Sequence, residues 1–115
     1  KAVRRAGLDY WELLDLKLYN NYEEFLEKNK NATVYYATTK TKKAHSDVIY
    51  GNNDIYIMFG KETGGIPKEI LELNKDNCIR IPMLNIEKAR SLNLSNSVAI
   101  AAYEVLRQWN YPGMR

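Results

Sequence analysis

The chain has 115 residues, of which 17 are Lys or Arg and 14 are Asp or Glu, so its formal net charge is +3. This length fits one domain with a sizeable apolar core, and a small positive charge permits a nucleic-acid partner without requiring one. The longest uncharged apolar stretch, Val98 to Tyr103, is far shorter than the roughly 20 residues that cross a bilayer. We therefore expect a single-domain cytoplasmic protein without a membrane span.

Cysteine and histidine are too scarce for the sites that these residues usually build. Cys78 is the one cysteine of the chain and His45 its one histidine. A single cysteine cannot form an internal disulfide, and one cysteine with one histidine falls short of the ligands that a zinc site needs. We therefore expect a reduced protein without a metal.

The first elements predicted along the chain are a short helix, a strand and a second helix. A helical pattern over residues 2–6 ends at Gly7, and because it opens the chain directly, without Met, we expect that residues upstream are missing. Leucines between Leu13 and Leu18 partly alternate and predict a strand. One of two adjacent asparagines then caps an amphipathic helix from Tyr22 to Lys28.

The middle of the chain predicts two strands separated by a long loop. Ala32 to Thr38 is rich in β-branched and aromatic residues, as strands are. Residues 39–53 carry charges, glycine and paired asparagines, so we expect a loop with a short extended piece at Val48 to Tyr50. Asp54 to Phe59 is apolar at consecutive positions, which indicates a central parallel strand covered on both faces.

The last third predicts a helix, a short strand and the longest helix. Pro67 suits the first turn of a helix that runs to Leu73, and Cys78 to Ile81 is a short strand. From Leu94 to Trp109 apolar residues recur every three or four positions, and further apolar residues widen this surface. Such a helix is either simply well buried or shared with a second subunit. Strands alternating with helices predict an α/β fold, a mostly parallel sheet with helices on both faces.

Two polar loops are expected to form one ligand pocket. Phe59–Pro67, and Arg80–Met83 leading into Arg90–Asn96, each follow an apolar run and lead toward a helix. Both should therefore lie at the carboxyl ends of strands, where α/β proteins bind ligands. The glycines match neither the Walker spacing nor the dinucleotide fingerprint. Gly60 would let a ligand approach the backbone, and Glu62 offers a carboxylate beside it.

The segment before the longest helix carries more polar side chains than a helix start requires. These side chains are Ser91, Asn93, Ser95 and Asn96. One of them is enough to cap the helix, and capping alone is one interpretation. The other interpretation is that a basic or amide side chain, such as Arg90 or Asn93, also faces the pocket.

The motifs resemble those of a known family. Phe59–Pro67, Arg80–Met83 and Ser91–Asn96 are similar, in this order, to motifs two and three of the SpoU branch of the SPOUT RNA ribose methyltransferases. Arg4–Glu12 and Tyr103–Gly113 resemble more narrowly the TrmL group, which methylates the ribose of the wobble nucleotide in certain leucine tRNAs. The resemblance runs the length of the chain.

The resemblance implies a carboxyl-terminal trefoil knot and S-adenosylmethionine as the cofactor, bound largely through backbone groups of three loops. Carried over by matching position, the cofactor-binding residues are Ala37, Gly60, Ile81, Ser91 and Leu92. Glu62 and Asn93 match the motif-two carboxylate and the motif-three amide, and they are the candidate catalytic residues. Their expected work is to organise the loops and to orient the ribose or a catalytic arginine.

The same resemblance suggests which residues contact RNA. They are Lys61, Arg90, Tyr103 and Arg107. Some relatives carry arginine where this chain has Gly64, so a phosphate contact is lost there, and Lys61 could partly replace it. The catalytic arginine of the family belongs to motif one, which would precede Lys1, so we expect this chain to lack it.

The sequence therefore predicts one domain, residues 1–115, of a homodimeric, S-adenosylmethionine-dependent tRNA ribose 2′-O-methyltransferase that acts on the anticodon loop. Two alternatives within the family stay open, namely a non-catalytic knotted RNA-binding protein and a methyltransferase of another tRNA or rRNA ribose. A third alternative, a phosphate-binding α/β domain of another enzyme class, requires the similarity of Ser91–Asn96 to be a coincidence.

Overall fold

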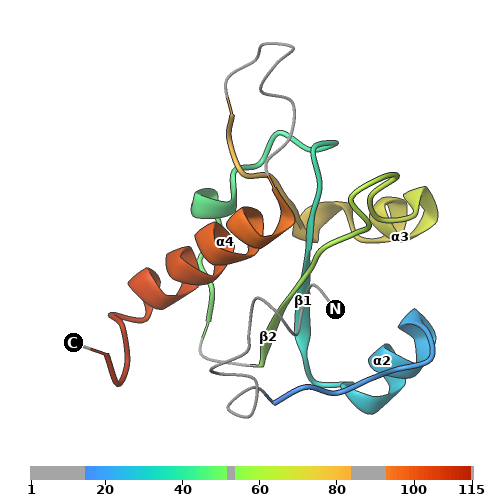
Figure 1. The fold of residues 1–115 in the computed structure, drawn as a ribbon, viewed down its shortest axis with the longest axis horizontal. Coiled ribbons are helices and arrows are strands. Elements are labelled where there is room, and N and C mark those ends of the chain that lie inside the picture. The colour runs from blue at the N-terminus through green and yellow to red at the C-terminus, as the bar shows by residue number, and fades with distance from the viewer. Residues whose placement is uncertain (1–14, 52–53, 84–92, 115) are drawn as a thin grey trace. The chain divides into compact units, whose positions relative to one another are not determined.

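The computed structural model of the chain describes residues 15–51, 54–83 and 93–114 (Figure 1). The chain divides into two compact units, Lys1–Lys30 and Asn31–Arg115. The opening helix predicted at residues 2–6 lies outside the described residues. Among the helices that are described, none combines the length and the apolar character needed to cross a membrane.

The described part of the first unit is built around α2, Tyr22–Lys28, with the bounds that the sequence predicts. Asn21 caps it, because its side-chain oxygen accepts the Glu24 N–H at 2.8 Å. The ring of Tyr19 meets that of Phe25 edge-on at 5.4 Å. The strand predicted to end at Leu18 is wrong over residues 15–18, which are irregular and exposed. Alternating leucines favour a strand only where a neighbouring strand is present to accept its hydrogen bonds.

The second unit contains a three-stranded parallel sheet. Its strands are β1, Thr33–Ala37, β2, Ile55–Met58, and β3, Cys78–Ile79, in the order β2-β1-β3. The register pairs Thr33 with Ile55 and Tyr36 with both Met58 and Cys78. All three strands fall within the predicted segments, and the parallel arrangement is confirmed.

Among the described strands β1 lies in the middle, and the expectation that residues 54–59 form a central strand stays a prediction. Val34 and Tyr36 of β1 are buried, whereas each residue of β2 is half-buried. A consecutive apolar run reports that both faces of a strand are covered. It does not report the order of strands, which depends on pairing between distant segments.

Two helices accompany this sheet, α3, Lys68–Leu73, and α4, Leu94–Gln108, and Figure 1 shows them on either side of the strands. Pro67 precedes α3 with φ −53°, a value already suited to a helix start, and its carbonyl accepts the first intrahelical bonds from Ile70 and Leu71. Both predicted helices are confirmed. The knot prediction depends on residues 84–92, outside the described ranges, and it stays a prediction.

The segment between β1 and β2 is organised by a short 3₁₀-helix, η2, His45–Asp47, and the extended piece expected at Val48 to Tyr50 forms no strand. A second 3₁₀-helix, η3, Lys75–Asn77, leads into β3. Tyr50 is buried, donates its hydroxyl to the His45 carbonyl at 2.6 Å and packs edge-on against the ring of Tyr35 at 5.0 Å. This burial raises the pKa of Tyr50 to about 12.

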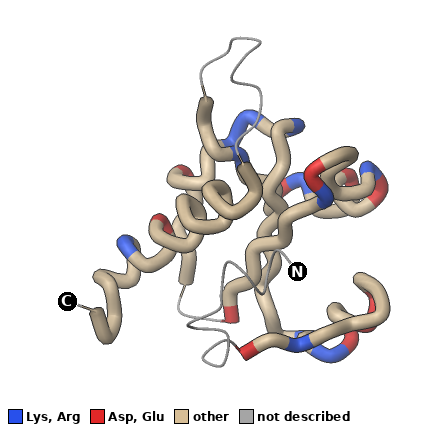
Figure 2. The backbone as a smooth tube through the Cα atoms, viewed as in Figure 1, with Lys and Arg blue, Asp and Glu red and all other residues tan. Residues whose placement is uncertain are grey.

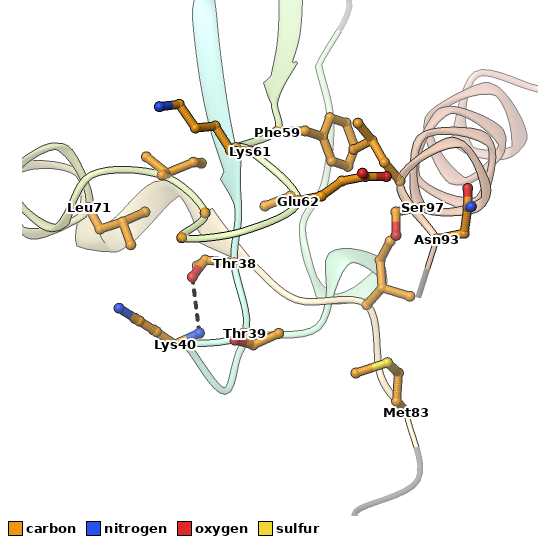
Figure 3. Close-up of a pocket in the computed structure, with 17 residues that line it drawn as sticks. Thr38, Thr39, Lys40, Phe59, Lys61, Glu62, Leu71, Met83, Asn93 and Ser97 are labelled. Carbon is orange, nitrogen blue, oxygen red and sulfur yellow. Dashed lines mark hydrogen bonds between the residues drawn. The ribbon is translucent and has the colours of Figure 1, made fainter. Parts of the chain in front are cut away.

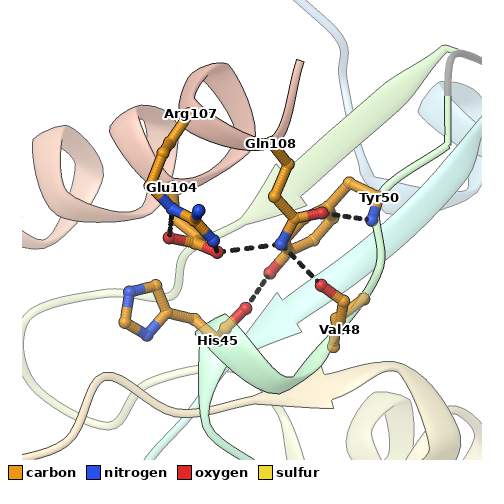
Figure 4. A network of polar contacts seen from close by, with 6 residues as sticks. All are labelled: His45, Val48, Tyr50, Glu104, Arg107 and Gln108. Atoms are coloured by element: carbon orange, nitrogen blue, oxygen red, sulfur yellow. Dashed lines mark hydrogen bonds and ion pairs between the residues drawn. The ribbon is translucent and has the colours of Figure 1, made fainter. Parts of the chain in front are cut away.

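The carboxyl-terminal end of α4 is fixed to this segment by Gln108 (Figure 4). Its side-chain oxygen accepts the Tyr50 N–H at 2.9 Å, and its nitrogen donates to the Val48 carbonyl at 2.7 Å and to the Glu104 carboxylate at 2.8 Å. The neighbouring Trp109 indole N–H donates to the backbone carbonyl of Tyr50 at 3.2 Å. One amide side chain therefore joins two segments that lie far apart in the sequence.

We predict that Gln108→Ala lowers the free energy of unfolding by about 1 to 3 kcal/mol, because the half-buried backbone groups of Val48 and Tyr50 lose their partner. Urea denaturation of the variant and the parent protein measures this difference. Asn96→Ala is the matched control, since Asn96 is exposed on the same helix. Equal stability of the two variants would contradict the role given to Gln108.

Candidate functional site

A cavity of about 540 Å³ lies at the carboxyl ends of the three strands (Figure 3). Three loops and the first turn of α4 line it, and all of them belong to the second unit. The lining consists of Ala37, Thr38, Thr39 and Lys40 after β1, Phe59 to Glu62 with Gly64, Gly65 and Ile66 after β2, Ile81 and Met83 after β3, Leu71 of α3, and Asn93, Leu94 and Ser97. The volume is in the usual range of small-molecule sites.

The loop after β2 is a tight turn that requires its glycines. Gly65 N–H donates to the Lys61 carbonyl at 3.1 Å, and Gly64 and Gly65 have φ values of 96° and 68°, which side chains rarely adopt. A Cβ atom at Gly60 would lie 2.2 Å from the Gly65 carbonyl carbon and 2.3 Å from the Ile66 nitrogen. Gly60 is therefore required for the loop to fold back on itself, whether or not a ligand is bound.

The conformation of Gly64 bears on the expectation that an arginine contact is lost at this position. No heavy atom outside its chain neighbours lies within 4 Å of a Cβ placed there, so space does not forbid a side chain. The positive φ does disfavour one. Glycine therefore suits this turn because of its backbone conformation and not because of limited space.

The loop after β1 is held in place by Arg80. Its guanidinium donates to the Thr39 carbonyl at 3.2 Å, and its backbone exchanges hydrogen bonds with Lys43 and His45. The strand pair β1 and β3 is extended by this contact, since Ala44 and Arg80 form a parallel bridge. Ile81 follows directly, so the same interactions fix two walls of the cavity.

Asn93 caps α4 and lines the cavity at the same time. Its side-chain oxygen accepts the Ser95 N–H at 2.8 Å and the Ser95 hydroxyl at 2.5 Å. Among the described residues its amide nitrogen has no partner, and this nitrogen is the group of Asn93 that can serve a ligand as a donor. The two interpretations of this segment, capping and pocket function, are thus compatible for one residue.

Glu62 lies on the loop after β2 and lines the same cavity as Asn93. Figure 3 shows its side chain extending toward α4, where Asn93 and Ser97 lie, while the side chain of Lys61 extends the other way. No ion pair within the described residues involves Glu62. Its carboxylate is therefore an acceptor on the side of the cavity where α4 presents an amide.

Six of the candidate residues come together at this cavity, namely Ala37, Gly60, Lys61, Glu62, Ile81 and Asn93. Arg90, Ser91 and Leu92 lie outside the described residues. Tyr103 and Arg107 do not line the cavity and lie farther along α4, where Tyr103 is 56% exposed. Sequence reasoning missed Lys40 and Ser97 as lining residues, although their positions just after a strand and at the helix start were a usable signal.

Arg107 is engaged within the protein. Its guanidinium makes a two-point contact with the Glu104 carboxylate, at 3.0 Å from Nε and 2.9 Å from Nη2. The hydrogen bonds from Arg107 and Gln108 lower the pKa of Glu104 to about 2, against an ordinary value of 4.5. A phosphate that binds Arg107 would have to share it with this carboxylate.

We predict that Glu104 makes stability depend on acidity below about pH 4.5. Because its pKa is depressed in the folded state, its contribution is complete above the unfolded value near 4.5 and is lost as the pH falls toward about 2. Denaturation midpoints of the parent and Glu104→Gln proteins should converge over this interval. Glu72→Gln is the control, because its partner Lys68 lies 4.0 Å away on an exposed surface, and the same convergence there would contradict the assignment.

Comparison with known proteins supports the fold class and the family resemblance. The SpoU rRNA Methylase family matches residues 1–103. A protein of Listeria monocytogenes is 48% identical over 113 residues, which cover 96% of this chain and 66% of that protein. The tRNA (cytidine(34)-2′-O)-methyltransferase of Escherichia coli is 46% identical over 114 residues, which cover 98% of this chain and 71% of that protein.

A solved structure described by the methylation of the 2-OH of C/U34 on tRNA superposes with a TM-score of 0.81 at 36% identity, over 92% of this chain and 67% of its own. The chain thus spans about two thirds of the length of the relatives it matches. With the family match over residues 1–103, these similarities define the class, an α/β RNA methyltransferase fold. The chain belongs to the SpoU rRNA Methylase family.

Proposed function

We propose that this protein is an S-adenosylmethionine-dependent tRNA ribose 2′-O-methyltransferase that modifies the wobble nucleotide, cytidine or uridine, of leucine tRNAs. The observation that carries the proposal is the convergence of Gly60, Glu62, Ile81 and Asn93 from separate segments on one cavity. Support for the tRNA substrate comes from the name of the Escherichia coli relative and from the subject of the superposed structure.

The residues of the cavity fit the proposed cofactor. Ile66, Leu71, Ile81 and Leu94 offer apolar surface for an adenine ring, and the turn at Gly60 presents backbone instead of side chains. The cofactor would supply an electrophilic methyl group on a sulfonium. Ala37, Gly60 and Ile81 would hold it through their backbone, together with Ser91 and Leu92.

Two polar side chains of the cavity, Glu62 and Asn93, would bind and orient the ribose. Glu62 can accept a hydrogen bond, and the amide nitrogen of Asn93 can donate one, so the pair can orient a hydroxyl group in line with the methyl donor. Neither residue is assigned as the base that removes the proton.

We predict that Gly60→Ala abolishes cofactor binding, because the added Cβ collides with the backbone of Gly65 and Ile66 and opens the turn. Isothermal titration calorimetry with S-adenosylmethionine measures the effect. Gly51→Ala is the matched control, since a Cβ there has no neighbour within 4 Å. Unchanged binding by Gly60→Ala would place the cofactor elsewhere.

We predict that Asn93→Ser lowers the rate of methyl transfer about tenfold or more while cofactor affinity and stability are kept. Serine preserves the helix cap, whereas it lacks the amide donor. Asn93→Ala removes both functions and should also lose about 1 kcal/mol of stability. Tritium transfer from labelled cofactor to a leucine tRNA transcript gives the rate. Full activity of Asn93→Ser would show that capping is the whole role of Asn93.

The RNA would lie across Lys61, Arg90, Tyr103 and Arg107, and it would present an unpaired anticodon nucleotide whose 2′-hydroxyl distinguishes RNA from DNA. Because Arg107 is paired with Glu104, it would bind RNA only through hydrogen bonds that it shares with this carboxylate. The non-catalytic alternative differs in one outcome, since such a protein would bind tRNA without transferring a methyl group.

The proposal includes a homodimer, a trefoil knot and a cytoplasmic location. Exposed apolar residues on α4 support the dimer, since Val98 is 43% exposed, Ile100 39% and Tyr103 56%. A second copy of the chain packed on this helix would cover them. Analytical ultracentrifugation gives the oligomeric state directly.

A further inference from the structure

Several lysines lie around the cavity, and the role inferred for them rests on the proposed function. In the described part of the second unit, several cations have partners within the protein. Lys68 pairs with Glu72, Arg107 with Glu104, Arg80 donates to Thr39, and Lys43 donates to the Asp76 carbonyl at 2.6 Å. Cations that are not engaged in this way are the ones available to a partner.

Four exposed lysines of this part of the chain have no acidic partner among the described residues: Lys40, Lys42, Lys61 and Lys75. Lys40 and Lys61 line the cavity, and Lys42 follows Lys40 in the same loop. Figure 2 shows several basic positions at the turn that follows β1, besides those elsewhere in the chain. Three of the four unpaired lysines thus flank one site.

The two loops present their charges on one side of the cavity. In Figure 3 the side chains of Lys40 and Lys61 extend toward the same side, opposite to the direction of Glu62. The cation-rich side is therefore separated from the side where α4 carries Asn93 and Ser97. A ligand that occupies both sides of the cavity would be bound best if it carried a negative charge near the lysines and its reacting group near Asn93.

The loop that carries Lys40 and Lys42, residues 38–43, is held by several hydrogen bonds. Thr38 N–H donates to the Ile79 carbonyl at 2.9 Å, and the Thr38 hydroxyl accepts the Lys40 N–H at 3.1 Å. The Lys43 carbonyl accepts the Arg80 N–H at 2.8 Å. These bonds fix the backbone, so the two lysines are presented to solvent from an ordered position and lose little further backbone freedom on binding.

We propose that Lys40 and Lys42, together with Lys61, form a phosphate-binding rim that holds the RNA backbone beside the nucleotide to be methylated. Lysine binds phosphate as a compact, mobile charge and supplies affinity without reading the base sequence. The rim therefore positions the strand, while other residues select the nucleotide. Lys43, which is engaged with Asp76, has no part in it.

The test measures the dissociation constant of a leucine tRNA transcript at several salt concentrations. For Lys40→Gln/Lys42→Gln we expect tRNA affinity to fall roughly fivefold for each lysine. The plot of log affinity against log salt should become less steep, its slope decreasing in magnitude by about 1.4 in total. The Michaelis constant for tRNA should rise while the rate at saturating tRNA is kept. Calorimetry should show unchanged cofactor affinity.

Two control variants accompany this experiment. Lys40→Arg/Lys42→Arg keeps both charges and should restore tRNA binding, while Lys75→Gln removes an equally unpaired lysine that does not line this cavity and should have no effect. A loss no larger than that of Lys75→Gln would overturn the rim. So would a loss of cofactor affinity with tRNA affinity intact, because the lysines would then bind the carboxylate of the cofactor.

The two proposals fail in different ways in this experiment. A parent protein that transfers no methyl group to tRNA contradicts the proposed function. A parent protein that is active, with a double variant that binds tRNA equally well at every salt concentration, contradicts the rim alone.

Discussion

The parallel pairing of β1 with both β2 and β3 is the constraint on which the rest of the second unit depends. Because all three strands run in the same direction, their carboxyl ends meet at one edge, and the loops that follow them share one cavity. β1 is buried through Val34 and Tyr36, so the pairing is stabilised by apolar burial as well as by hydrogen bonds. Ala37, Gly60 and Ile81 are brought together by this geometry and by no local feature.

The two ends of α4 have different roles, since its start lines the cavity and its end is bonded to the segment between β1 and β2. Asn93 and Ser97 line the cavity in its first turn, while Gln108 fastens its last turn to the segment from Val48 to Tyr50. Some 11 residues separate the first-turn residue Ser97 from Gln108, or about 16 Å of helix. The position of the amide in the site is therefore set by packing and hydrogen bonds remote from it.

The basic side chains also fall into two groups, those bonded within the protein and those exposed at the cavity. Arg80, Lys43 and Arg107 are committed to internal acceptors, which fixes the loop after β1 and the end of α4. Lys40 and Lys61 remain on the cavity side facing solvent. This division allows a protein with a net charge of only +3 to present a local basic surface to an anionic partner.

Sequence alone determined the elements whose causes are local. The helix at Tyr22–Lys28, the strand segments, the start of α3 after Pro67 and the extent of α4 follow from caps, periodicity and β-branched runs. Only the tertiary structure decided that β1 lies between β2 and β3, that residues 15–18 form no strand and that Gly60 is required by the backbone of Gly65. It likewise decided that Lys40 lines the cavity. The strand order and the lining of the cavity depend on contacts between segments distant in the chain, and a local pattern carries no record of which distant segment will be its neighbour.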